Sequence, residues 1–255
     1  MRRSFPTIAK ILLAIPLSTL AFTLSGCGLT ACHEVNLIDF SSGFTKSGLS
    51  LNGWAALSGN VLQLTNGNIS EAASAWVAEM PVWSFTSDFT FQLINPNADG
   101  ITFAIQNTGT HALGNLGGGL GYQGIGKSVA IKFDLWNNDG EGINSTGVYI
   151  DGPRPTIPAI DLTGTGIDLH SGHVMQVHVA YEGTTLSYTI TDTMTGAAVT
   201  ETATVDIPTV VVGDYAYVGF TGGTGGSTAT QNILTWTYAF INQGSQQTCQ
   251  ASSSK

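Results

Sequence analysis

Apolar and polar residues alternate along several short segments of the chain, and turn residues separate these segments. Residues 89–93, 177–181 and 185–190 each carry apolar side chains at every second position. Because successive side chains of a β-strand point to opposite faces, this period predicts strands with one buried face. Glu182-Gly183, between the second and third segments, favours a hairpin turn. The last patterned segment predicts a strand with four large apolar side chains on one face: Leu234, Trp236, Tyr238 and Phe240.

The segment 129–136 shows this alternation most clearly. One of its faces is wholly apolar and consists of Val129, Ile131, Phe133 and Leu135. We expect this face to pack in the core between two sheets. The opposite face ends in Asp134 and Trp136, and packing does not explain an acid and an indole at that place. The end of this predicted strand is therefore a candidate binding site.

The chain predicts a single all-β domain. No segment has helical periodicity of useful length, and the chain has no sequence repeat. Gly is abundant, with 32 of 255 residues, and only 10% of residues are charged. This composition favours strands and turns. Many short strands separated by turns predict an antiparallel β-sandwich of two sheets over residues 35–242. Residues 243–255 are rich in Ser and Gln, and we expect a disordered tail there.

The charge balance narrows the class of partner. The formal net charge is −9, and three of the eight basic residues lie in the first ten positions. An acidic surface repels phosphate backbones, which argues against a nucleic acid partner. Neutral sugars and a bound cation remain compatible with this balance.

The first 26 residues are typical of a signal peptide. A positively charged start precedes an apolar stretch from residue 11 to residue 24, which is short for a membrane span. Leu24-Ser25-Gly26-Cys27 then resembles the lipobox of bacterial lipoproteins. This predicts an exported protein of the bacterial cell envelope, lipidated at Cys27 and followed by a tether over residues 27–34. An ordinary cleaved signal peptide and an uncleaved anchor helix are the alternatives.

Two further cysteines flank the patterned region. Cys32 lies just before it and Cys249 just after it. An exported compartment permits disulfides, so we expect a Cys32–Cys249 bridge that joins the terminal segments. Two free thiols are the alternative.

The loop after residue 136 is rich in oxygen ligands. It reads Asn137-Asn138-Asp139-Gly140-Glu141-Gly142. Hard cations such as calcium prefer carboxylate, amide and backbone oxygens. Asp134, Asn138, Glu141 and the backbone carbonyl of Trp136 could supply them at one calcium site. A hairpin loop that needs Asn and Gly for its geometry is the alternative.

Several stretches together resemble the legume-type (L-type) lectins. Residues 98–103, 117–122, 129–150 and 217–238 are similar to four motifs of that family, in the same order. The resemblance covers about residues 35–242. It implies a concanavalin-like jelly roll and a carbohydrate-binding protein without catalytic activity, with glycans as partners.

The resemblance also implies the site residues. Position by position, the sugar would be held by Asp99, the amide of Gly118 or Gly119, Asn138 and the ring of Trp136. The loop from Gly222 to Gly226 would set specificity by its shape, with Gly223 and Thr224 as its candidate residues. In the family the bond before the aspartate is cis, which implies a cis Ala98–Asp99 peptide bond.

This sequence departs from the motifs of the family at two places that concern metal binding. The family usually has a second, transition-metal site, whose Glu and His correspond here to Lys132 and Ser145. An ammonium group repels a cation, so we expect no manganese-type site, and the Lys132 charge could act in its place. The loop after Asn138 is shorter than usual, which leaves open whether Glu141 or Asp139 completes the calcium site.

Two other functions stay open at this stage. A structural or adhesive envelope domain could keep the fold after losing sugar binding. A glycan hydrolase needs two carboxylates about 5 to 10 Å apart, and Lys132 stands beside Asp134 where a second acid would be expected.

His170 and His173 suggest zinc, but without a third ligand nearby a turn is favoured. The sequence does not indicate the sugar or the oligomeric state.

Overall fold

The computed structural model describes residues 33–242. The predicted signal peptide, Cys27, Cys32, Cys249 and the predicted tail lie outside the described residues. The signal peptide, the lipid anchor and the disulfide therefore stay predictions. Among the described residues, no helix is both long and apolar enough to cross a membrane.

The first of two antiparallel sheets has eight strands, in the order β13-β12-β11-β6-β15-β4-β3, with β1 paired to β15. Its strands are β1 (His33–Asp39), β3 (Ala56–Ser58), β4 (Val61–Asn66), β6 (Ser84–Ile94), β11 (Val174–Glu182), β12 (Thr185–Asp192), β13 (Ala198–Thr204) and β15 (Thr230–Asn242). The predicted hairpin is confirmed, because β11 ends at Glu182 and pairs with β12.

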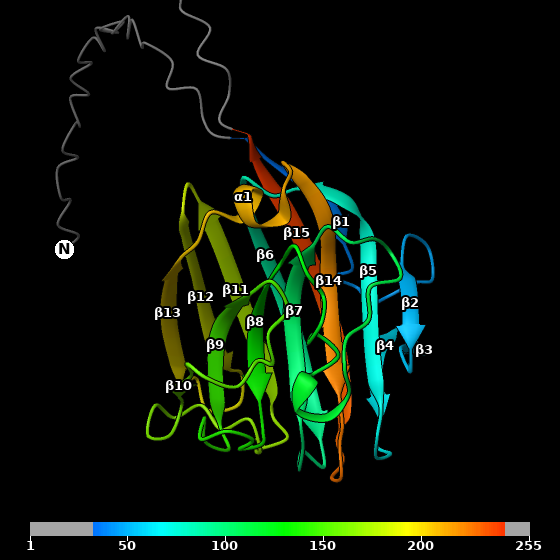
Figure 1. Ribbon diagram of the computed structural model, residues 1–255, viewed down its shortest axis with the longest axis vertical. Helices are drawn as coiled ribbons and strands as arrows, with labels where there is room; N and C mark the ends of the chain where they lie inside the picture. The colour runs from blue at the N-terminus through cyan, green and yellow to red at the C-terminus, as the bar shows by residue number, and fades with distance from the viewer. Residues whose placement is uncertain (1–32, 243–255) are drawn as a thin grey trace, which may run out of the picture. The chain divides into compact units, whose positions relative to one another are not determined.

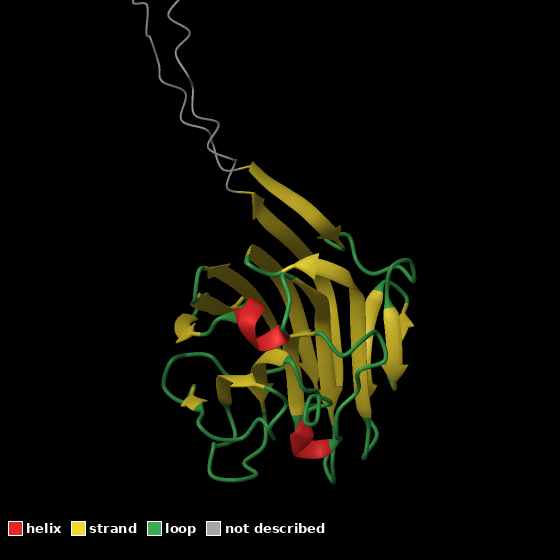
Figure 2. Cartoon of the chain, turned by 45° about the horizontal axis from the view of Figure 1, so that its top comes forward, coloured by secondary structure: helices red, strands yellow, loops and turns green. Residues whose placement is uncertain are grey.

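The second sheet has seven strands, in the order β10-β9-β8-β7-β14-β5-β2. Its strands are β2 (Ser50–Gly53), β5 (Ala72–Pro81), β7 (Gly100–Gln106), β8 (Ser128–Asp134), β9 (Ser145–Ile150), β10 (Ile160–Asp161) and β14 (Tyr215–Gly223). The described residues also form two short helices, η1 (Gly117–Gly119) and α1 (Ile207–Val211), which are the red elements in Figure 2. Figure 1 shows the two sheets stacked as layers, so the predicted β-sandwich is confirmed.

The main core lies between the two sheets. Phe89 of β6 stacks on Phe103 of β7 with ring centroids 5.5 Å apart, and meets Phe220 of β14 edge-on at 5.0 Å. The apolar face predicted for the segment 129–136 is confirmed, since all four of its side chains are buried in this core: Val129, Ile131, Phe133 and Leu135. Large side chains from both sheets thus hold the sandwich together.

The last strand differs from its prediction at one position. Trp236 and Tyr238 are buried in the main core, but Leu234 is not among the core residues. The pairing of β15 with β6 shifts between Ile233 and Thr235. This β-bulge puts Ile233 into the core in place of Leu234, because an extra residue reverses the faces of the strand beyond it.

A second apolar cluster covers the outer face of the seven-stranded sheet. Its buried members come from the sheet and from the long segment 107–127: Trp76, Ala104, Tyr122, Ile125, Ala130 and Tyr149. The indole Nε1 of Trp76 donates to the carbonyl of Ala112 at 2.7 Å. The Tyr122 hydroxyl accepts from Ser128 Oγ at 2.9 Å. These contacts hold the segment that carries η1 against the sheet.

Candidate functional site

The predicted site residues meet at one end of the seven-stranded sheet. The antiparallel register places Gly100, where β7 begins, opposite both Asp134 of β8 and Gly223 of β14. Asp99, the loop after β8 and the loop after β14 therefore lie at the same edge. Figure 1 shows this edge, with η1, at the lower end of the sheet.

Asp99 lies at the centre of these loops. The predicted cis Ala98–Asp99 bond is confirmed. The backbone amide of Asp99 donates to the Gly223 carbonyl at 3.2 Å, and its carbonyl accepts from the Leu135 amide at 2.7 Å. Asp99 is thus fixed by both neighbouring loops.

The Asp99 carboxylate keeps unmet hydrogen-bonding capacity. The residue is only 4% exposed, and its Oδ2 atom is buried without a hydrogen-bond partner among the described residues. Burial raises the pKa of Asp99, while the Gly225 amide, the Arg154 guanidinium and the Asn138 side chain act in the opposite direction. A buried carboxylate oxygen without a donor is costly unless a ligand or water supplies one.

Glycines allow the close approach of these loops. A Cβ on Gly118 would lie 2.5 Å from Oδ1 of Asn138, and one on Gly225 would lie 3.1 Å from Oδ2 of Asp99. A Cβ on Gly119 would instead meet Asn115, which lies in the same loop. Of the two glycines that the sequence left open, Gly118 therefore faces the site, because only a residue without a side chain fits there.

The prediction for the loop after β14 needs correction. Gly223 and Thr224 are buried, and the Thr224 hydroxyl donates to the Asn68 carbonyl at 2.8 Å and accepts from the Glu71 amide at 3.1 Å. Thr224 therefore supports the loop from inside. Gly225 is the residue of this loop that lies beside Asp99. Sequence spacing alone could not distinguish the two faces of such a short turn.

Trp136 lies at the start of the loop after β8. Its side chain is 45% exposed, which leaves the indole face open to a ligand. Its role in sugar binding stays a prediction.

Lys132 and Asp134 form an ion pair beneath this loop. The Lys132 Nζ atom lies 2.9 Å from Oδ2 of Asp134, and the two side chains are 0% and 1% exposed. Lys132 also donates to the Thr156 carbonyl at 2.8 Å. Burial raises the pKa of Asp134 to about 6, against the opposing effect of the Lys132 charge. The Lys132 ammonium thus favours the ionised form of Asp134.

The other predicted calcium ligands also have protein donors. Oε1 and Oε2 of Glu141 accept from the backbone amides of Asn138 at 2.9 Å and Asp139 at 2.6 Å. Burial acts to raise the pKa of Glu141, but these amides hold it below its usual value. Oδ1 of Asn138 accepts from the Arg154 guanidinium at 2.6 Å. The carbonyl of Trp136 accepts from the Asn138 amide group at 3.3 Å.

This donor set does not fit a divalent cation as it stands. Asp134 already pairs with an ammonium group, and Asn138 already accepts from a guanidinium group. Two like unit charges roughly 4 Å apart repel by about 4 kcal/mol at an effective dielectric constant of about 20, and a divalent ion doubles this. Within residues 33–242, no group of three or more His, Cys, Asp and Glu side chains is placed to hold a metal.

Arg154 is a residue of this site that the sequence did not point to. It lies 16 residues after Asn138 in the chain, and it reaches both Asn138 and the exposed Asp139, whose Oδ2 is 3.3 Å from Nη1. The signal that could have found it is the scarcity of basic residues, because the predicted domain contains only four. Ser145, which the resemblance places at the position of a metal-binding histidine, lies opposite Asp134 in β9.

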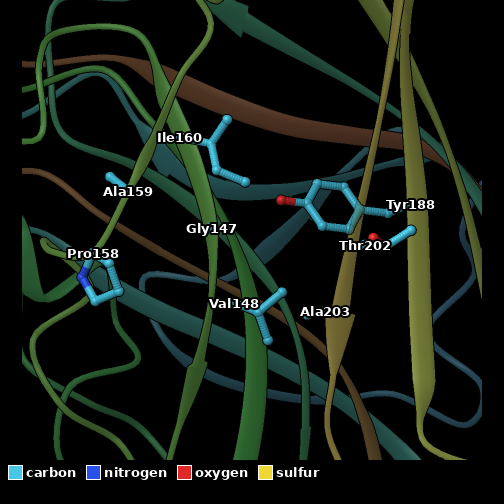
Figure 3. Close-up of a pocket in the computed structure, with 8 residues that line it drawn as sticks. All are labelled: Gly147, Val148, Pro158, Ala159, Ile160, Tyr188, Thr202 and Ala203. Carbon is cyan, nitrogen blue, oxygen red and sulfur yellow. The ribbon is translucent and has the colours of Figure 1, made fainter.

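Two other features lie apart from this set of residues. His173 pairs with Asp192 at 2.8 Å, and the His170 ring hydrogen-bonds the Ile143 carbonyl at 2.7 Å, so each histidine has a structural partner. A cleft of about 170 Å³ lies between the two sheets. Its lining residues carry no charge and are drawn in Figure 3: Gly147, Val148, Pro158, Ala159, Ile160, Tyr188, Thr202 and Ala203.

Known proteins resemble this chain in sequence. It is 30% identical over 170 residues to an L-type lectin-domain containing receptor kinase of Arabidopsis thaliana, a match that covers 61% of this chain and 23% of the kinase. It is 28% identical over 169 residues to favin of Vicia faba, which covers 62% of this chain and 70% of favin. The chain thus spans about a quarter of the length of the curated receptor kinases it matches.

Known proteins also resemble it in structure. The basic winged bean lectin, solved with the Tn antigen, superposes with a TM-score of 0.71 and 23% identity, over 81% of this chain and 98% of the lectin. At this identity the likeness shows the fold alone.

The match to a protein family covers most of the chain. Residues 35–254 match the family described as the legume lectin domain. Its members are lectins, which bind carbohydrate without converting it, so the prediction of a domain without catalytic activity agrees with the family. The chain therefore belongs to the legume lectin domain family.

Proposed function

We propose that this domain binds carbohydrate through the loops around Asp99, without chemical turnover. The observation that carries the proposal is the Asp99 carboxylate, which is buried among three loops with one oxygen lacking a protein donor. Neighbouring hydroxyls of a sugar ring are donors of the right kind. Hydrogen bonds from them to an ionised carboxylate are charge-assisted and therefore strong.

Other residues of the site have roles that complement Asp99. Gly118 and Gly225 let the loops lie close together, because a Cβ at either position would crowd Asn138 or Asp99. The exposed indole of Trp136 offers an apolar face on which the C–H groups of a pyranose can pack. Asn138 supports the carboxylate from the side.

Galactose and its N-acetylated form are the first sugars to test. Among the solved neighbours, a lectin from Bauhinia forficata was solved with N-acetylgalactosamine and the lectin UEA-II with galactose. These ligands belong to those proteins. They make a galactose-type sugar the starting hypothesis for this chain.

The sequence also predicted that binding depends on calcium. In the described residues the predicted ligand oxygens already accept from Lys132, Arg154 and backbone amides. We therefore assign no part of sugar binding to a calcium ion. Chelation of the purified protein tests this part of the proposal.

The place of action rests on the sequence alone. The lipobox-like segment that ends at Cys27 supports an exported, lipid-anchored protein of the bacterial cell envelope. The Cys32–Cys249 disulfide has indirect support, because His33 pairs with Asn242 and the two ends of the described residues lie side by side. Mass spectrometry of the mature protein tests both modifications.

One observation favours a second candidate, an envelope domain that has lost sugar binding. Both ends of the Asn138 side chain have protein partners: Arg154 donates to Oδ1, and Nδ2 donates to the Trp136 carbonyl. In that case the Asn138 side chain would stabilise the loop and would not bind a ligand.

A glycan array followed by calorimetry separates the two candidates. We expect the wild-type protein to bind a galactose-type sugar, and Asp99→Asn to bind it about 100-fold more weakly or not at all. Charge-assisted hydrogen bonds contribute about 1.5–3 kcal/mol each, and about 1.4 kcal/mol is tenfold in affinity. The matched control is Asp88→Asn, an exposed aspartate of the eight-stranded sheet. Equal binding by Asp99→Asn and wild type would refute the site, and no binding on the array would favour the second candidate.

A further inference from the structure

We propose that the Lys132 ammonium and the Arg154 guanidinium replace the divalent cations of this site, so that the domain folds and binds sugar without calcium or manganese. This inference rests on the proposed function, and it concerns what holds the sugar-binding loops in place. Lys132 and Arg154 are then positioning residues, since the ligand itself would contact Asp99 and its neighbours.

Lys132 occupies the position of a structural cation. Its side chain is fully buried, and its ammonium group bonds Oδ2 of Asp134 at 2.9 Å and the Thr156 carbonyl at 2.8 Å. The Tyr149 ring lies 5.5 Å away and adds a cation–π contact. A carboxylate, a backbone carbonyl and an aromatic face thus surround one positive charge.

The ion pair is connected to the binding loop. The second oxygen of Asp134, Oδ1, accepts from the backbone amide of Trp136 at 3.1 Å. The two oxygens of one carboxylate thus accept from the Lys132 ammonium and from the Trp136 amide, which connects the buried ion pair to the start of the loop after β8. A metal ion bound to Asp134 would act on the same residue.

Arg154 holds the outer part of the same loop. Its guanidinium donates to Oδ1 of Asn138 at 2.6 Å and to Oδ2 of Asp139 at 3.3 Å. Its charge also acts on Asp99, where it opposes the effect of burial, which raises the pKa of that carboxyl. The guanidinium therefore joins two loop residues that the sequence assigned to a calcium site.

Basic residues are scarce in the described part of the chain, so the positions of Lys132 and Arg154 are informative. All 17 acidic residues of the chain, but only four of its eight basic residues, lie within residues 33–242. These four are Lys46, Lys127, Lys132 and Arg154. Two of them converge on the segment 134–139, which is the segment where a metal-binding lectin would need positive charge.

The first test needs no sugar. The full chain is stripped with a chelator, its metal content is measured, and it is titrated by calorimetry with calcium chloride and then with manganese chloride. We expect no saturable binding of either ion and an unchanged melting temperature. Binding of about one ion per chain, the stoichiometry of a calcium site, would overturn the inference.

The second test uses sugar. Methyl galactoside, N-acetylgalactosamine and methyl mannoside are titrated into wild type in chelator and in calcium. We expect affinities that agree within about twofold, whereas a tenfold loss in chelator, about 1.4 kcal/mol, would overturn the inference. If none of the three sugars binds, the proposed function fails for these sugars, and the ion titrations still decide whether the cations replace a metal.

Variants connect the result to the two side chains. Lys132→Glu places a second acid beside Asp134, and we expect its melting temperature and sugar binding to depend on added manganese or calcium. Lys46→Glu, the same charge change at an exposed position, is the control. Arg154 is about half-exposed, so Arg154→Gln should fold, and we expect its sugar affinity to be about tenfold lower. Lys127→Gln, at another exposed basic residue, should keep the sugar affinity of wild type. Unchanged sugar binding in chelator by both Lys132→Glu and Arg154→Gln would contradict the inference.

Discussion

The two faces of the seven-stranded sheet are built in different ways. The inner face packs against the other sheet through apolar side chains such as Phe103, Phe133 and Phe220. The outer face buries polar groups beside its apolar cluster; they include Gln106, Ser128 and the charged Lys132. The inner core determines whether the sandwich forms. The outer layer holds the segment 107–127 and the loop after β8, which carry residues of the proposed sugar-binding site.

The largest effect is expected in the inner core. Phe89→Ala removes a ring that contacts Phe103, Phe133 and Phe220. It should lower the free energy of unfolding by about 3–5 kcal/mol, because it leaves a cavity among packed rings. Urea unfolding measures the change. A loss below about 1 kcal/mol would mean that the rings repack freely, and the contrast between the two faces would disappear.

A smaller effect should separate the two layers by function. Trp76→Phe deletes the indole donor to the Ala112 carbonyl, which keeps a bond from Ser74 Oγ at 2.6 Å. The free energy of unfolding should fall by about 1 kcal/mol, as for one hydrogen bond. Hydrogen exchange should rise in residues 107–127, and the sugar affinity should fall with it.

Trp236→Phe is the matched control for Trp76→Phe. It deletes an equivalent indole hydrogen bond, to Ser87 Oγ at 3.0 Å, but in the inner core. We expect a similar loss of stability with no change in sugar affinity. If both variants lose affinity equally, the outer layer has no special part in holding the loops.

The smallest effect concerns a turn outside both layers. Asp192, at the end of β12, accepts from His173 and from the backbone amides of Met194 and Thr195. Burial acts to raise the pKa of Asp192, but these donors outweigh it and lower the pKa. The stabilisation by ionised Asp192 is therefore complete above its unfolded pKa of about 3.9, and it is lost as the pH falls through the lower folded value.

Asp192→Asn tests this sign. At pH 6 the variant should be less stable than wild type in urea unfolding, and the difference should shrink below about pH 3.9. A difference that stayed constant with pH would show that the ionised carboxylate contributes nothing beyond its neutral form.

Much of the fold could be predicted because alternation is a local signal. The four apolar residues of the segment 129–136 are buried as expected, since a strand in a β-sandwich turns one of its faces toward the opposite sheet. The burial of Ile233 in place of Leu234 could not be predicted. The bulge that causes it depends on pairing with a strand more than 140 residues earlier in the chain.

The candidate site was predicted only in part. The cis bond before Asp99 was implied by the resemblance to the family, which rests on motifs that are continuous in sequence. The choice of Gly118 over Gly119 could not be predicted, because it depends on the approach of Asn138 from another loop. The contact of Arg154 with Asn138 depends on the path of the chain beyond β9, which no local pattern encodes. The inward position of Thr224 likewise depends on the Asn68 and Glu71 partners that the fold brings to it.

The most direct test is a crystal structure from crystals grown in millimolar calcium with the monosaccharide that binds best. It should show sugar hydroxyls on the Asp99 carboxylate and the Lys132 ammonium still bonded to Asp134. No ion should be coordinated by Asp134, Asn138 or Glu141. A calcium ion held by these three residues, or a sugar bound away from Asp99, would contradict the account.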